Sequence, residues 1–325
     1  MTGALPEATD ALIALVREIY EEDHVLLHRP VFDGNERAYL VDCIDSNFVS
    51  SVGARVQEFE AQCAGFTGTG HAVAAMNGTA ALHMGLMLAG VERGDEVLTQ
   101  ALTFVATCNA LSYIGAAPVF IDVDRDTMGL SPAALARWLE THAERRDGRA
   151  YNKSTGARLA ACVPMHTFGL PMRIAEVAEI CRDWGVALVE DAAESLGSYV
   201  GTRHTGTFGA LAALSFNGNK IITTGGGGMI LTDDPDLAAR GLHLTTTAKI
   251  PHAYEYVHDE IGYNYRLPNI NAALGVAQME RLPEMLEIKA KVAARYRDVA
   301  AHHGLTYADG IDGTQPNYWL NALVL

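Results

Sequence analysis

Short apolar runs alternate with amphipathic segments through the middle of this chain, and this alternation limits it to few folds. Apolar residues of one segment fall on a single helical face: Ile174, Val177, Ala178 and Cys181. Strands are expected at 96–100, 118–123, 159–164 and 186–191, and helices at 79–90, 104–115, 131–140 and 173–185. Strands and helices that alternate in this way form a largely parallel sheet covered by helices, so the sequence predicts an α/β fold.

The chain of 325 residues is long enough for one large domain and a smaller appended one. Two further strands are expected at 212–216 and 227–233, followed by a mainly helical stretch to about His303 whose break near Pro283 indicates a connecting helix pair. Residues 143–157 are strongly polar and are expected to form a surface loop. We predict an N-terminal helical segment (1–30), a large domain (31–268), and connecting helices that lead into a smaller, apparently incomplete C-terminal α/β domain (269–325).

Charge and cysteine content exclude several classes of protein. The net charge of −15 disfavours nucleic acid or an anionic membrane as a partner. The five cysteines are scattered, without a CxxC pair, which argues against disulfides or a zinc knuckle. Neither a signal peptide nor a stretch of 18 apolar residues is recognisable, so a cytoplasmic protein with reduced thiols is expected.

Motifs of several common enzyme classes are absent. No GxxxxGK[ST] phosphate loop occurs, and Gly68-Thr69-Gly70 precedes a strand instead of joining a strand to a helix, so it is interpreted as a turn. His24 and His28 have the spacing of zinc ligands on a helix but lack the adjacent glutamate, which predicts solvated histidines and no metal site.

Three separate segments suggest a catalytic site when they are taken together. Asp191 ends an apolar run, which places its carboxylate at the edge of a parallel sheet where ligands bind. Lys220 follows a strand end and precedes the glycine run 225–228, and the turn 77–80 opens a helix whose free N–H groups attract phosphate. Each has an ordinary alternative: a helix cap, a surface lysine and a plain turn. Together, an acid, a lysine and a phosphate cradle match the needs of pyridoxal 5'-phosphate (PLP).

The runs VEDAAES, SFNGNK and GGGGM, with NGTAAL and TFVAT upstream, resemble the DegT/StrS family of nucleotide-sugar aminotransferases over residues 27–325. PVFDGNERAYLVDCIDSNFVSSVG, MHTFG, NKIITTGGGGMI and HDEIGYNYRLPNINAALG are most similar to its LegC-like branch. The resemblance implies a fold-type I PLP enzyme. It also implies a homodimer whose active sites draw residues from both subunits.

Roles for individual residues follow from this resemblance. Lys220 would hold PLP as a Schiff base and move the proton, and Asp191 would keep the pyridine nitrogen protonated. The remaining implied contacts are the phosphate on Gly78, Thr79, Ala80 and Ser215, the ring on Phe104, and Asn264 reaching over from the partner subunit. Phe104 as part of a helix core and Asn264 as a turn residue remain alternatives.

Two residues keep open roles. Glu194 stands where many relatives carry glutamine beside the phenolic oxygen of PLP, and a carboxylate there would repel a phenolate unless one of them holds a proton. His166 follows a strand and is either a substrate contact or a satisfied core histidine. The glycine run 225–228 is either architectural or a flexible loop.

The resemblance implies transfer of an amino group from an amino acid, expected to be L-glutamate, to a nucleotide-linked 4-keto-6-deoxy sugar in amino-sugar or surface-polysaccharide biosynthesis. The LegC-like strings suggest a UDP-linked 2-acetamido-4-keto sugar. A PLP-dependent sugar dehydratase of the same family is the first alternative, but those enzymes carry histidine in place of Lys220. A non-catalytic regulator is the second, and the intact set of Asp191, Ser215 and Lys220 argues against it.

Overall fold

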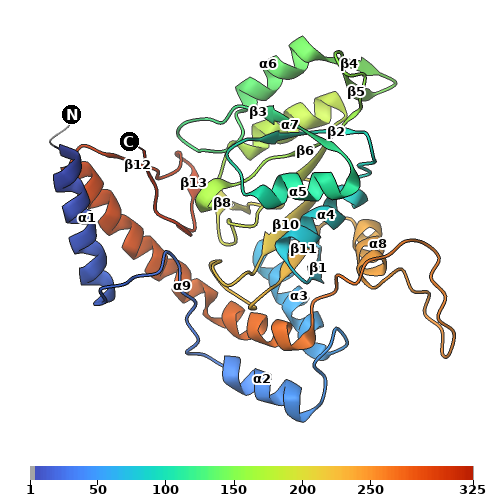
Figure 1. The fold of residues 1–325 in the computed structure, drawn as a ribbon, viewed down its shortest axis with the longest axis horizontal. Coiled ribbons are helices and arrows are strands. Elements are labelled where there is room, and N and C mark those ends of the chain that lie inside the picture. The colour runs from blue at the N-terminus through green and yellow to red at the C-terminus, as the bar shows by residue number, and fades with distance from the viewer. Residues whose placement is uncertain (1–3, 325) are drawn as a thin grey trace.

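A seven-stranded mixed sheet forms the centre of the computed structural model, which describes residues 4–324 (Figure 1). Its strand order is β1-β11-β10-β7-β6-β2-β3, and only β11 runs antiparallel to its neighbours. The strands are β1 (His71–Ala75), β2 (Glu96–Gln100), β3 (Ala117–Ile121), β6 (Leu159–Val163), β7 (Ala187–Asp191), β10 (Leu211–Ser215) and β11 (Gly228–Thr232). The largely parallel sheet expected from the sequence is confirmed.

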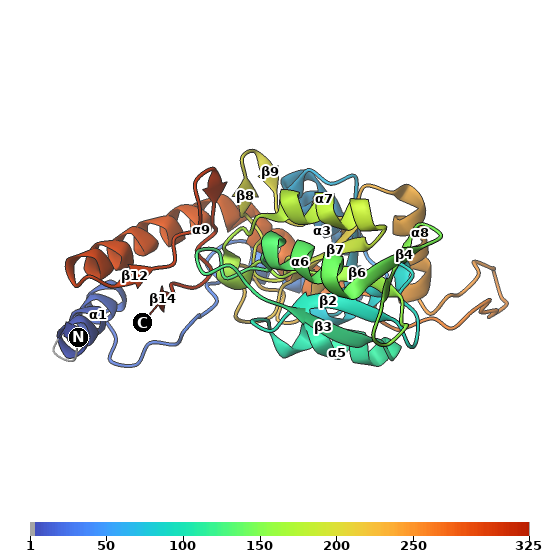
Figure 2. The same cartoon turned by 90° about the horizontal axis from the view of Figure 1, so that it is seen from above.

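Helices cover both faces of this sheet, and Figure 2 shows α5 on one side with α6 and α7 on the other. Successive strand residues point to opposite layers, so Val189 packs in one apolar cluster and Leu188 in another. One layer holds α4 (Gly78–Leu88), α5 (Val105–Ile114) and α8 (Pro235–Thr245). The other holds α3 (Ala54–Thr67), α6 (Pro132–His142), α7 (Ile174–Trp184) and the first half of α9 (Asn269–His302).

Local sequence signals set several helix ends. The side chains of Ser131 and Asp234 cap the first turns of α6 and α8, each followed by proline at the first helical position. Gly115 and Gly185 end α5 and α7 in the left-handed conformation, with φ of 86° and 67°. The four helices expected at 79–90, 104–115, 131–140 and 173–185 therefore begin and end within two residues of the predicted positions.

An arm extends from the sheet along α9 (Figure 1). Helix α1 (Ala4–Tyr20) packs against its far half, where Glu18 and Arg295 form an ion pair at 2.8 Å, and α2 (Glu36–Asp45) packs against its near half. Short strands β12 (Thr306–Tyr307) and β14 (Leu323–Val324) pair beside the arm. None of the helices between residues 4 and 324 combines the length and apolarity that a membrane crossing requires.

The surface loop expected at residues 143–157 is not irregular throughout. Residues 143–157 contain a hairpin of β4 (Ala143–Arg146) and β5 (Arg149–Asn152), because Asp147 and Gly148 both adopt positive φ and form the tight turn that such hairpins need. A separate three-stranded sheet joins β13 (Thr314–Gln315), β8 (Tyr199–Val200) and β9 (Arg203–His204).

The expected helix pair with a break near Pro283 is instead one continuous helix of 34 residues. Pro283 itself is exposed, and the helix continues through it although proline cannot donate a hydrogen bond to the Met279 carbonyl. The helical stretch expected from Asp234 onward is interrupted earlier, because residues 246–268 between α8 and α9 are irregular. A turn at Thr167–Gly169 forms a short 3-10 helix.

Candidate active site

The carboxyl ends of β1, β7 and β10 lie at one edge of the sheet, because these strands run in the same direction. Asp191 ends β7, Ser215 ends β10, and Gly78 opens the helix that follows β1. A Cβ on Gly78 would lie 2.8 Å from the Cβ of Ser215, so only glycine allows this approach. The edge therefore brings together three residues that the sequence predicts for one site.

Free donors at the start of α4 face this edge. The first N–H groups of a helix, here those of Gly78 and Thr79, have no acceptor within the helix. The Ala80 N–H, expected in the same cradle, instead donates to the Asn77 side chain at 2.8 Å, which caps the helix. The amides of Gly78 and Thr79 remain available for an anion, together with the positive end of the helix dipole.

The glycine run 225–228 has an architectural role at its last position. A Cβ on Gly228 would lie 2.3 Å from the Asn77 carbonyl oxygen, so β11 passes against the Asn77 turn with no room for a side chain. Gly225 adopts a φ of 78°, which also favours glycine. The run holds the start of α4 against the sheet edge.

Asp191 is a buried carboxylate with two hydrogen-bond donors of its own chain. The Thr107 hydroxyl donates to Oδ2 at 2.7 Å, and the Ala193 N–H donates to Oδ1 at 3.2 Å. Burial raises the pKa of Asp191, and these hydrogen bonds and the charge of Lys220 act in the opposite direction. A cation placed beside such a buried carboxylate would stabilise its charged form.

Lys220 is not the solvated surface lysine of the ordinary alternative. Its Nζ lies 3.4 Å from Oε1 of Glu194, and the two side chains are only 11% and 6% exposed. The other carboxylate oxygen of Glu194 accepts the Phe168 N–H at 2.8 Å. Burial raises the pKa of Glu194, while the positive charge of Lys220 acts to lower it.

A C-terminal segment that the sequence analysis did not single out contacts the loops that carry Lys220 and Glu194. The ring centroid of Trp319 lies 4.2 Å from Nζ of Lys220, and the indole N–H donates to the Asn219 carbonyl at 2.6 Å. The Asn317 side chain donates to the Glu194 carbonyl at 2.9 Å. The run NYWLN gave no signal for these contacts, because it has the pattern of an ordinary strand.

His166 matches the core alternative. It is fully buried, with Nε2 3.0 Å from Glu190 and Nδ1 accepting the Met172 N–H at 3.4 Å. Burial opposes the charge on Glu190, but hydrogen bonds from His166 and from the N–H groups of Gly206 and Gly209 outweigh it and lower the pKa of Glu190. Both ring nitrogens are engaged by the protein, which leaves none for a substrate.

Phe104 and Asn264 are both exposed. Phe104 precedes α5 with 65% of its surface accessible, so it is not part of a helix core. Asn264 forms a backbone bridge with Thr246 in the irregular segment before α9. No hydrogen bond among residues 4–324 joins Asn264 to Ser215 or Lys220.

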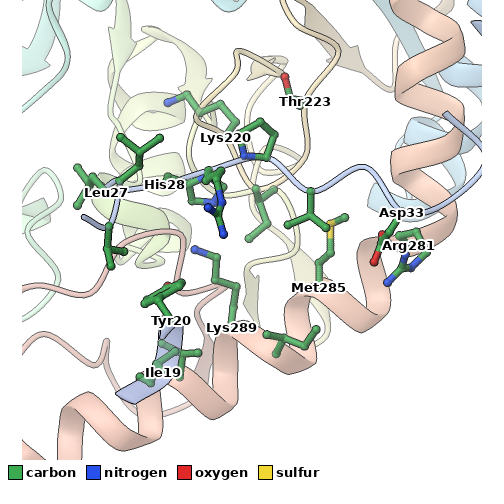
Figure 3. A pocket seen from close by; sticks show the side chains of 18 of the residues that line it. Ile19, Tyr20, Leu27, His28, Asp33, Lys220, Thr223, Arg281, Met285 and Lys289 are labelled. Atoms are coloured by element: carbon green, nitrogen blue, oxygen red, sulfur yellow. Dashed lines mark hydrogen bonds and ion pairs between the residues drawn. The ribbon is translucent and has the colours of Figure 1, made fainter. Parts of the chain in front are cut away.

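A cavity of about 350 Å³ opens beside Lys220, between α9 and the segment that follows α1 (Figure 3). Its walls are mainly apolar, with residues such as Leu27 and Met285, but Lys289 and His28 also line it. Burial lowers the pKa of Lys289 to about 8. Burial, followed by the charges of Lys289 and Lys220, lowers the pKa of His28 to about 4. The expectation of a solvated His28 is therefore wrong.

The sequence and fold of this chain are similar to those of known aminotransferases. The sequence profile described as the DegT/DnrJ/EryC1/StrS aminotransferase family matches residues 30–324. GDP-perosamine synthase of Vibrio cholerae is 36% identical over 92% of this chain and 77% of its own length. The aminotransferase TlmJ of Streptoalloteichus hindustanus superposes with a TM-score of 0.82 at 30% identity, covering 92% of this chain and 78% of TlmJ. DesI, solved in the presence of its TDP-sugar product, superposes with a TM-score of 0.77 at 30% identity, covering 91% of this chain and 71% of DesI.

Proposed function

Because this chain belongs to the DegT/DnrJ/EryC1/StrS aminotransferase family, we propose that it aminates a UDP-linked 2-acetamido-4-keto-6-deoxy sugar with L-glutamate as donor. It is a PLP-dependent aminotransferase that acts on nucleotide-linked sugars. The UDP-linked acceptor and the LegC-like branch rest on the string HDEIGYNYRLPNINAALG and its companions. The similar GDP-perosamine synthase and DesI are named for GDP and TDP sugars, so the nucleotide is the part of the proposal that most needs a test.

The observation that carries the proposal is the largely buried side chain of Lys220 beside a sheet edge that holds Asp191 and the free amides of α4. These residues fit PLP. The close approach of Gly78 to Ser215 puts two amides and a hydroxyl at one place, which suits a phosphate. Asp191 offers a buried carboxylate for a ring nitrogen, and the exposed ring of Phe104 is free to stack on a pyridine.

Bound PLP supplies an electron sink for the charge left on a substrate carbon when its proton is removed. Asp191 would keep the ring nitrogen protonated, because a buried carboxylate favours a cation beside it. Lys220 would hold the cofactor through Nζ, and its amine would carry a proton to and from the substrate carbon. Glu194, whose Oε1 lies 3.4 Å from Nζ, would orient the Lys220 side chain.

A panel of keto-sugars linked to UDP, GDP and dTDP, each incubated with glutamate and analysed by mass spectrometry, tests this function. We expect an amino-sugar product from the UDP-linked acceptor. A product that has lost a hydroxyl group instead would indicate the dehydratase. No product from any acceptor, with cofactor bound, would indicate a regulator.

We also propose a two-fold homodimer in which Asn264 completes the cofactor site of the partner subunit. Asn264 is exposed and free of side-chain contacts to Ser215, and the nearby side chains Tyr254, Tyr256 and Ile261 are about four-fifths exposed. Such large apolar side chains on one segment are typical of a contact surface. Sedimentation should therefore give a dimer, and a monomer that retains full PLP occupancy would contradict this prediction.

Replacing Glu194 by glutamine should leave kcat within about tenfold of the wild-type value, a change of about 1.4 kcal/mol in the barrier. Glutamine keeps the size and still accepts the Phe168 N–H, and it removes a charge that would repel a phenolic oxygen. Glu194→Ala is the control, because it also leaves that N–H without a partner. A kcat for Glu194→Gln as low as that of Glu194→Ala would show that the charge itself is required.

A further inference from the structure

Lys289 is a partly buried cation that lacks an anionic partner. Its Nζ donates to the Trp319 carbonyl at 3.0 Å, and no carboxylate among residues 4–324 forms an ion pair with it. The other cations of the same cavity are paired: Lys220 with Glu194, Arg29 with Glu22, and Arg281 with both Asp33 and Glu284. A lysine is seldom buried without a partner, because removing its charge from water is costly.

His28 presents a second unsatisfied group to the same cavity. Its Nδ1 is buried and has no hydrogen-bond partner among the described residues. A buried polar atom without a partner costs about 1–3 kcal/mol, so such an atom usually has a ligand or a water molecule as its missing partner. Figure 3 shows His28 on the segment after α1 and Lys289 reaching from α9 into the pocket.

Lys289 and His28 lie close to Lys220, the residue proposed to carry the reaction. Trp319 contacts both lysines, one through its ring and the other through its carbonyl oxygen. Lys220, Lys289 and His28 all line the same cavity. The apolar walls of the cavity lower the local dielectric, so an ion pair formed there is stronger than one at the surface.

We propose that Lys289 and His28 form an oxyanion-binding site that holds an anionic group of a substrate beside Lys220. Lys289 supplies the charge, and His28 supplies one hydrogen bond through the nitrogen that now lacks a partner. This inference rests on the proposed function, which offers two sources of such a group: a carboxylate of the amino donor and the diphosphate of the nucleotide sugar. The cavity of about 350 Å³ is in the usual size range of ligand pockets.

Lys289→Met, Lys289→Arg and His28→Ala in the full-length holoenzyme test the site. Lys291→Met is the matched control, since Lys291 is exposed on the same helix. Lys289→Met should raise KM for one substrate by about tenfold or more, corresponding to about 1.4 kcal/mol, with kcat changed much less. Lys289→Arg should retain most of the affinity, and His28→Ala should raise the same KM by a smaller factor. An increase in the donor KM identifies the carboxylate, and an increase in the acceptor KM identifies the diphosphate.

Calorimetric titration with glutarate and with UDP gives a readout independent of turnover, because neither compound can be transaminated. Lys289→Met should weaken binding of one of them by about tenfold. Tm should change little, because losing the hydrogen bond to the Trp319 carbonyl is offset by removing a partly buried charge without an anionic partner. Unchanged binding of both probes and unchanged KM values would overturn the proposal. If no keto-sugar is aminated but a probe still requires Lys289, the proposed function fails while this site stands.

Discussion

Lys220→Ala is expected to abolish transamination while leaving the fold and the cofactor contacts in place. The side chain lies at the edge of a cavity, and within residues 4–324 its polar contacts are with Glu194 and the ring of Trp319, so its loss breaks no structural network. In the proposed mechanism Lys220 is both cofactor ligand and proton carrier, so kcat should fall by more than about 10³-fold. PLP should still bind, without a covalent bond, through the amides of α4 and Asp191.

Borohydride treatment followed by peptide mass analysis checks this assignment. In the wild-type protein, the cofactor mass should be found on the peptide that contains Lys220. In Lys220→Ala, cofactor should be released on denaturation. Lys153→Ala, at an exposed position, is the control and should behave as wild type. Cofactor attached to any other peptide of the wild-type protein would show that the covalent site lies elsewhere.

Asp191→Asn should lower kcat by about 10²–10⁴-fold, because an amide cannot offer the negative charge that keeps a ring nitrogen protonated. The fold should survive, since asparagine can still accept the hydrogen bond from Thr107. Comparison with Glu194→Gln, using the same keto-sugar, separates two acids that are both buried. Equal losses at the two positions would mean that the nitrogen of the cofactor does not face Asp191.

Strand periodicity explains why much of this site could be anticipated from the sequence. Apolar runs that end in Asp191 and Ser215 place those side chains at the same sheet edge, and the turn before Gly78 opens a helix there. The engagement of Ala80 by Asn77 could also have been foreseen, because asparagine before a helix is a strong cap. The tight turn at Asp147-Gly148 is likewise a recognisable hairpin signal.

Other parts of the site have no local signal. His28, Lys289 and Trp319 lie in three segments far apart in the sequence and meet only because α9 continues through Pro283 and carries Lys289 to the cavity. A lysine on a helix of mixed composition normally indicates a solvated face. Only the packing of α1 and of the C-terminal segment around α9 buries it. The role proposed for Asn264 also has no local signal, because it requires a partner subunit.

The contacts of Trp319 make its fluorescence sensitive to changes at Lys220. The emission of an indole depends on the electric field around its ring, and this ring lies 4.2 Å from the ammonium of Lys220. Of the three tryptophans, Trp138 and Trp184 pack with the core between α6 and α7, away from this cation. A change in the charge or position of Lys220 therefore alters the fluorescence of one tryptophan and leaves two as an internal reference.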